Sequence, residues 1–111
     1  MDDVNMLELL TKAREYFREH GGAKRMFKDD EDDGRVCALG ALREVIDLSL
    51  EGSLVGRAGS LAYVAGAEYL ALHSRQLYGY SRVAVLNDLP HDTRPEILSV
   101  YDHAIKELEN G

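Results

Sequence analysis

Apolar residues recur at spacings of three and four along almost the whole chain, which is the period of an α-helix that buries one face. Met6, Leu9, Leu10, Ala13 and Phe17 show the pattern in the first stretch, and we find no convincing alternation of apolar and polar residues typical of a strand. A chain of 111 residues is long enough for one domain and too short for two ordinary ones. We therefore expect a compact all-α domain over residues 1–111.

Glycines and capping residues divide this pattern into four main helices. The first ends at Gly21 and Gly22, and the second runs from about Cys37 to Leu50. The second is apolar on most of its surface, which predicts a central, buried helix, and Gly40 inside it indicates that a neighbouring backbone needs the space. A glycine-rich connection at 52–59 leads to a third helix, which we expect to start at Ser60 and reach about Gln76.

The last helix has the clearest start. Thr93 and Glu96 form a Thr-x-x-Glu capping box, with Pro95 in the first turn. Before it, the segment from Ser81 to Asn87 predicts one short helical turn, although residues 83–85 also suit an extended conformation.

An acidic segment at residues 28–34 raises the question of a metal site. Asp29, Glu31 and Asp33, followed by Gly34, match the front half of a calcium loop. The twelfth loop position, which should give a bidentate carboxylate, is Gly40, so two of the six to eight oxygens that calcium requires are missing. Five neighbouring acids also repel one another. We therefore expect an exposed, mobile loop without bound metal, and we expect no cofactor.

Cys37 is the only cysteine, so the chain forms no internal disulfide. At a helix start its thiol would lie near unpaired amides, which can lower a cysteine pKa and make it a nucleophile. Its apolar neighbours favour a packed thiol instead. No local sequence ties a histidine to it, and the histidines lack metal-ligand spacing; they are His20, His73, His91 and His103. Cys37 remains the single catalytic candidate.

The start of the second helix also needs a hydrogen-bond acceptor. Up to four N–H groups are unpaired at a helix N-terminus, and no Ser, Thr or Asn immediately precedes Cys37. We propose from this that the Asn87–Asp88 turn packs near residues 35–38 and that one of its side chains accepts from those amides. The plainer alternative, slightly favoured, is that Asn87 and Asp88 only close their own turn.

Two short motifs resemble a known family. The stretch from Gly34 to Leu42, GRVCALGAL, is followed later by Leu86, Asn87 and Asp88 and a capped C-terminal helix. This order is similar to that of a small domain family of unknown function from actinobacteria and their phages, whose members usually carry tryptophan where this chain has Leu86. The resemblance implies such an origin and transfers no activity. It adds Arg35 to Cys37, Asn87 and Asp88 as motif and binding candidates.

Charge and hydropathy narrow the range of partners and cellular locations that we expect. Five of the acids behind the net charge of −7 lie at residues 29–33, and this balance disfavours nucleic acid as a partner. The longest apolar run, 61–72, is shorter than the roughly 20 residues of a membrane span. The acidic N-terminal residues do not suit a signal peptide, so we expect a cytoplasmic protein.

Two functions remain open. The first, which we favour, is a non-catalytic helical module that binds an unidentified protein partner, such as a phage-encoded accessory protein in a host cytoplasm. The second is a small enzyme or ligand-binding protein that uses Cys37, Asn87 and Asp88. A pocket that joins these three residues would favour the second function, and a filled environment around Cys37 would favour the first. The sequence does not indicate an oligomeric state.

Overall fold

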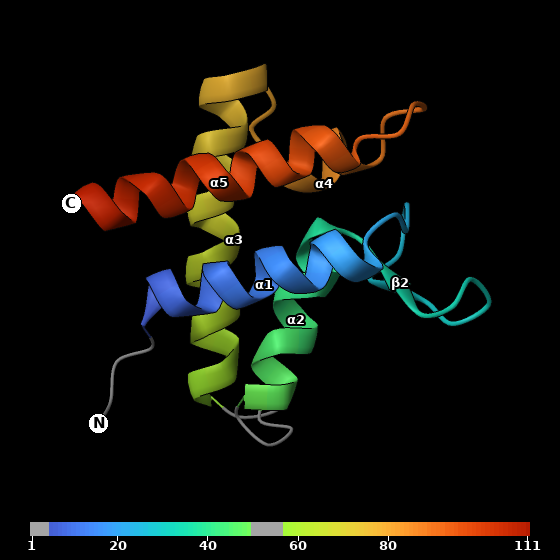
Figure 1. The fold of residues 1–111 in the computed structure, drawn as a ribbon, viewed down its shortest axis with the longest axis horizontal. Coiled ribbons are helices and arrows are strands. Elements are labelled where there is room, and N and C mark those ends of the chain that lie inside the picture. Colours follow the sequence, from blue (N-terminus) through green and yellow to red (C-terminus); the bar gives the residue numbers. More distant parts are fainter. Residues whose placement is uncertain (1–4, 50–56) are drawn as a thin grey trace.

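The computed structural model describes residues 5–49 and 57–111 (Figure 1). Its helices are α1 (Met6–His20), α2 (Ala38–Ser49), α3 (Arg57–Tyr78), α4 (Val83–Asn87) and α5 (Arg94–Asn110), and its strands are β1 (Lys28–Asp29) and β2 (Arg35–Val36). The all-α prediction of four main helices and one short turn is confirmed. No helix within the described ranges is both long and apolar enough to cross a bilayer.

The helices pack in two layers around one core. α1 and α5 lie alongside each other and cross in front of α3, while α2 packs against both α1 and α3 (Figure 1). The predicted buried face of α1 is confirmed for Leu9, Leu10, Ala13 and Phe17, and Met6 is partly buried. The largest fully buried side chains come from all four main helices: Phe17, Leu42, Ile46, Leu70, Ile97 and Tyr101.

One helix start differs from the prediction. α3 begins at Arg57, so the residues 57–59 that we placed in the glycine-rich connection belong to the helix, and residues 52–56 lie outside the described ranges. Arginine and alanine have high helix propensity, so the helix begins at Arg57, N-terminal to Ser60, despite Gly59. The predicted end of the second helix at Leu50 also lies outside the described residues.

The prediction of a capping box at the start of α5 is wrong. Thr93 is the N-cap residue, but its side chain makes no cap hydrogen bond and donates to the main-chain oxygen of Asn87 at 2.8 Å instead. Asp92 Oδ1 accepts from Arg94 N, 3.1 Å away, and Glu96 contacts His91. Thr93 is only 4% exposed. Its hydroxyl bonds to the turn that contains Asn87, so it is not available to the amides at the start of α5.

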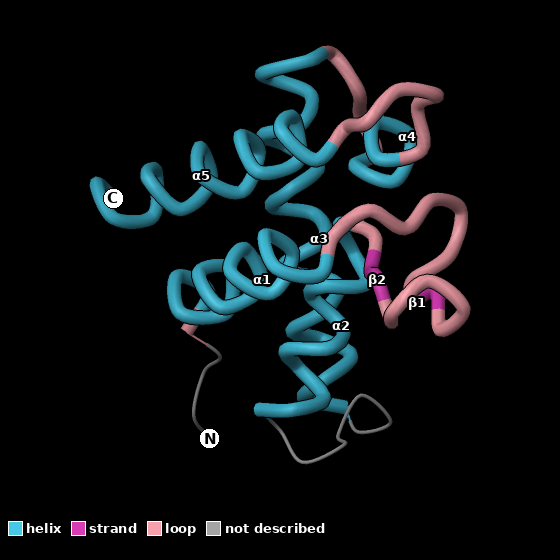
Figure 2. Tube along the Cα trace, turned by 45° about the vertical axis from the view of Figure 1, so that its right-hand side comes forward, coloured by secondary structure: helices cyan, strands magenta, loops and turns pink. Residues whose placement is uncertain are grey.

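The acidic segment forms a β-hairpin that the sequence did not reveal. β1 and β2 pair antiparallel, with Lys28 opposite Val36 and Asp29 opposite Arg35 (Figure 2). Asp33 and Gly34 close the connection with φ of 55° and 69°, a left-handed turn. Strands of two residues are too short to show alternation, which explains the omission. The side chains at 30–33 are exposed as expected; the mobility of this loop stays a prediction.

Gly40 confirms the expected close approach of backbone. A Cβ atom at this position would lie 1.9 Å from the main-chain oxygen of Phe27. The segment before the hairpin therefore runs directly over the first turn of α2, and this contact forms one wall of the site described next.

Candidate functional site

The first turn of α2 is held by partners from distant parts of the chain. Asn87 Oδ1 accepts from the amide of Ala38 at 2.9 Å, and the Cys37 amide donates to the main-chain oxygen of Phe27 at 3.1 Å. Cys37 Sγ accepts from Gly40 N at 3.2 Å. The predicted contact between the Asn87–Asp88 turn and the helix start is therefore confirmed, with Asn87 as the acceptor, and the slightly favoured alternative is wrong.

Asn87 bonds to several segments at once and is 3% exposed. Its Nδ2 donates to the Ala23 main-chain oxygen and to Asp88 Oδ1, each at 2.9 Å. Its own main-chain oxygen accepts from Lys24 Nζ and from the Thr93 hydroxyl, each at 2.8 Å. Because both side-chain groups of Asn87 have protein partners, this residue positions the site and has little left with which to bind a ligand.

Among the described residues, Asp88 uses one of its two carboxylate oxygens in hydrogen bonds. Its Oδ1 accepts from the Asn87 side chain and from the amide of Arg25 at 2.8 Å. Arg25 has a φ of 62°, in the left-handed region. Within the described residues Oδ2 of Asp88 accepts no hydrogen bond, although this residue lines a cavity.

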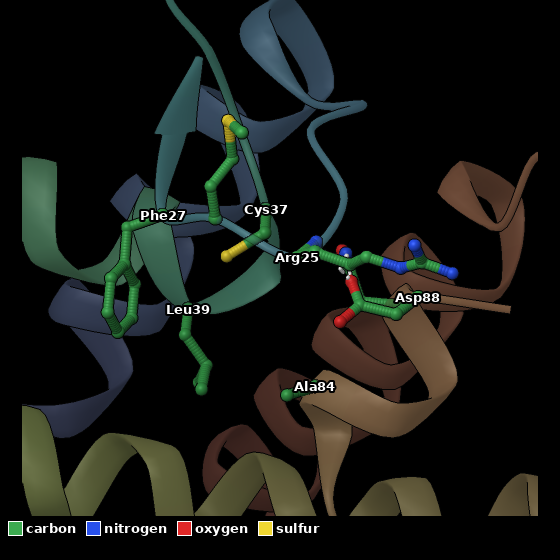
Figure 3. Close-up of a pocket in the computed structure, with 8 residues that line it drawn as sticks. Arg25, Phe27, Cys37, Leu39, Ala84 and Asp88 are labelled. Carbon is green, nitrogen blue, oxygen red and sulfur yellow. Dashed lines mark hydrogen bonds between the residues drawn. The ribbon is translucent and has the colours of Figure 1, made fainter.

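This cavity, which we name the Cys37 pocket, is open to solvent and has a volume of about 270 Å³ (Figure 3). It lies between the segment 25–27, the first turn of α2, and α4. Most of its walls are apolar; the lining residues are Arg25, Met26, Phe27, Cys37, Leu39, Ala84, Asn87 and Asp88.

The outer wall of the pocket is exposed but supported. Met26 and Phe27 are 47% and 43% exposed and lie next to each other at the mouth of the pocket. The guanidinium carbon of Arg43 lies 4.1 Å from the centroid of the Phe27 ring, a cation–π contact that holds the ring in place. In Figure 3 the Arg25 guanidinium points away from the space bordered by Cys37, Leu39 and Ala84.

The Cys37 thiol is poorly suited to nucleophilic catalysis. Burial raises its pKa, and the hydrogen bond from Gly40 opposes that rise only in part. A thiol with a raised pKa is protonated at neutral pH, whereas the nucleophile in cysteine chemistry is the thiolate. No histidine lines the pocket to remove the proton.

Arg35 does not share this site. Its guanidinium donates to the Gly21 main-chain oxygen at 2.8 Å and lies 3.6 Å from Asp32. It lines a separate open cavity of about 420 Å³, together with Lys24 and Arg94 among others. The structure therefore brings together three of the four motif residues.

The metal candidates lie on the hairpin. Asp29 Oδ1 accepts from the amide of Glu31 at 3.1 Å, and Asp33 occupies the tight turn. Within residues 5–49 and 57–111, no three His, Cys, Asp or Glu side chains lie close enough to hold a metal ion. A calcium titration by calorimetry tests the expected lack of micromolar binding.

Sequence reasoning missed most of the pocket wall: Arg25, Met26, Phe27, Leu39 and Ala84. One signal was present, because Gly40 indicated a close neighbour to α2. Nothing in the sequence identified Phe27 as that neighbour, since the contact depends on the path of the loop.

Comparison with known proteins gives one match. The model of a family described as "Family of unknown function (DUF6197)" matches residues 1–107. No curated protein and no solved structure matches the chain.

Proposed function

We propose that this chain, which belongs to the family of unknown function DUF6197, is a non-catalytic protein-interaction module. Its Cys37 pocket takes one side chain of a partner protein. The observation that carries the proposal is an open, mainly apolar pocket lined in part by Asp88, whose carboxylate uses only Oδ1 in the hydrogen bonds among the described residues. The resemblance of its motifs adds the proposal of an actinobacterial or phage origin and a cytoplasmic site of action.

The size of the pocket favours a side chain over a larger molecule. Pockets for drug-sized ligands usually span about 300–1,000 Å³ and enclose most of the ligand. The Cys37 pocket, at about 270 Å³, lies just below that range and is open on one side. A side chain that projects from a partner surface suits such a site because the rest of the partner covers the opening.

The lining selects a lysine or an arginine. The aliphatic stem of such a residue packs against apolar surface while its charged end stays near polar groups. Here Met26, Phe27 and Leu39 provide the apolar surface, and Oδ2 of Asp88 provides the acceptor. A charge-assisted hydrogen bond to this oxygen is stronger than a neutral one.

The acidic hairpin supports the same partner class. Phe27, on the pocket wall, is followed directly by β1, and five acids at residues 29–33 occupy the hairpin. Charge complementarity of this kind speeds the encounter with a basic segment and disfavours acidic partners. A basic stretch with one lysine or arginine in the pocket thus fits both the pocket and its surroundings.

A second candidate is a small-ligand binding protein, and the pocket that joins Cys37, Asn87 and Asp88 favours it by the criterion drawn from the sequence. Catalysis through these residues is disfavoured, since burial raises the pKa of Cys37 and the Asn87 side chain is fully hydrogen-bonded. A small organic cation would use the same apolar wall and the same carboxylate. The two candidates differ in whether a protein covers the opening of the pocket.

A pair of peptides tests the recognition chemistry. One carries a single lysine flanked by leucines, and the other carries norleucine in place of the lysine. In NMR titrations we expect amide shifts at residues 25–27, 37–39 and 84–88 with the lysine peptide and much smaller shifts with the norleucine peptide. Asp88→Asn keeps an acceptor for Arg25 and removes the charge, so it should abolish this preference. Equal responses to both peptides, or none, would contradict the proposal.

A matched pair of variants on α4 tests for a protein partner. Ala84 lines the pocket, so Ala84→Arg places a long side chain in it, whereas Val85 is 48% exposed and does not line it. We expect affinity capture from an actinobacterial lysate to recover a protein with the wild type and with Val85→Arg, but not with Ala84→Arg. If the lysine peptide binds and no captured protein shows this pattern, the small-ligand candidate is favoured.

A further inference from the structure

The outward face of α3 shares no residue with the Cys37 pocket. The inward face of the helix buries residues such as Ala62, Leu70 and His73. On the opposite side, large apolar residues are open to solvent, with Leu61 57%, Val64 50% and Leu72 47% exposed. We name this surface the outer α3 stripe; its exposed residues are Leu61, Val64, Ala65, Glu68, Leu72 and Arg75.

The spacing of the stripe is that of a helix–helix seam. Leu61, Ala65, Glu68, Leu72 and Arg75 follow one another at intervals of four, three, four and three residues. Residues at these intervals form one line along a helix, and this repeat is the one by which paired helices contact each other. Single exposed apolar residues are common on proteins, but Leu61, Ala65 and Leu72 share one line of this 22-residue helix with Glu68 and Arg75, so the line is part apolar and part charged.

The stripe carries two charged side chains, both exposed to solvent. Glu68 and Arg75 form no ion pair within the described residues. They lie two helical turns apart on the same face, one of each sign. An acid and a base placed in this way are complementary to a second copy of the same surface turned end over end.

We infer from this that two copies of the chain associate through their outer α3 stripes, with the two α3 helices antiparallel. Glu68 of each copy then pairs with the partner's Arg75, and the two-fold axis passes between Ala71 and Leu72, the midpoint of the charged pair. In this register residues 65–78 of the two α3 helices lie opposite each other, and Leu61 and Val64 lie beyond the end of the partner's α3. The two Leu72 side chains meet beside the axis. Such an interface is isologous, because the same surface is used by both copies.

The charges also disfavour the parallel arrangement. In a parallel pair Glu68 would face a second Glu68, and Arg75 a second Arg75. Like charges opposed at an interface are unfavourable, so they act against this register. The stripe thus specifies both the partner, a second copy, and its direction.

Sedimentation equilibrium with charge-reversal variants tests the inference. The wild type should have twice the mass of one 12.4 kDa chain at the concentrations used for NMR. Glu68→Arg and Arg75→Glu should each be monomeric. An equimolar mixture of these two variants should return to the dimer mass, because each pair of facing positions then again carries one acid and one base. The reversal Glu109→Arg on α5, outside the stripe, is the matched control and should remain dimeric.

Several outcomes would overturn the inference. A monomeric wild type would exclude the second copy as the occupant of the stripe. A dimer that survives both single reversals would place its interface elsewhere. A dimer that is lost in the single variants and does not return on mixing would exclude the antiparallel register. Circular dichroism of each variant shows that a loss of mass is not a loss of fold.

Discussion

At the scale of single residues, Asn87 connects the first turn of α2 to the segment before the hairpin. Asn87→Ala leaves the buried amide of Ala38 and the main-chain oxygen of Ala23 without these partners. A buried group left without its hydrogen bond costs about 1–3 kcal/mol. We expect the free energy of unfolding, measured in urea, to fall by at least that much. Asp88→Asn retains an acceptor for Arg25 and serves as the control, with a much smaller change.

The comparison between these two residues shows what the sequence could predict at this scale. The unpaired amides at the start of α2 predicted that Asn87 or Asp88 would accept from them, and this is confirmed. The choice of Asn87 depends on Asp88 being engaged by the amide of Arg25. Main-chain groups such as that amide are the same in every residue, so no sequence pattern reveals which of them lies nearby.

At the scale of elements, the packing of segment 25–27 on α2 requires Gly40. Gly40→Ala gains about 1 kcal/mol in helix propensity. The new methyl group would lie 1.9 Å from the Phe27 main-chain oxygen, however, and overpacking of this kind costs typically about 1–3 kcal/mol. We expect a net loss of thermal stability and changed amide shifts at the pocket. Gly66→Ala in α3 is the matched control, because its close neighbour is the Leu42 side chain, which can move.

The contact between α3 and α5 makes stability depend on pH. His73 is fully buried, with its Nδ1 2.7 Å from Nδ1 of His103 and its Nε2 2.9 Å from a Glu107 oxygen. Burial lowers the pKa of His73; the charge of Glu107 raises it in part, and His103 lowers it further. The ring of Tyr69 also packs on it. The folded state therefore favours neutral His73, and the unfolded chain binds a proton more readily.

The sign of the effect follows from that difference. The stabilisation from neutral His73 is fully present above the unfolded pKa of about 6.5 and is lost progressively as the pH falls from there toward the lower pKa of the folded state. Urea unfolding at several pH values should show a decline in stability toward acid. His73→Phe should reduce this decline, and His20→Gln, an exposed histidine at the end of α1, should leave it unchanged. An unchanged decline in His73→Phe would assign it to other groups.

Elements also differ in how far sequence predicts them. The sequence predicted the buried faces of α1 and α5 because the apolar period repeats over the full length of each helix. The hairpin at 28–36 was missed because each strand has two residues. The Thr93 capping box failed because a tertiary contact to Asn87 replaced a local bond. Local patterns therefore predicted the helices well and the connections poorly.

At the scale of the whole molecule, no helix packs alone. α1 contacts α2 and α5, and α3 contacts α2, α4 and α5, so the first and last parts of the chain share one core. We expect a single cooperative unfolding transition. Far-ultraviolet circular dichroism reports the helices, and near-ultraviolet circular dichroism reports buried tyrosines such as Tyr101. The two denaturation curves should coincide. Separate midpoints would mean that part of the helical layer unfolds on its own.

The hydrogen bonds of Asn87 and Lys24 also determine when, during translation, this part of the fold can form. They join positions 23 and 24 to position 87, separations of 64 and 63 residues along the chain. A nascent chain that has left the ribosome only as far as α3 lacks the acceptor for the first turn of α2 and one wall of the pocket. The first turn of α2 and the Cys37 pocket can therefore be complete only late in translation, and a product that ends before residue 87 lacks both this acceptor and this wall of the pocket.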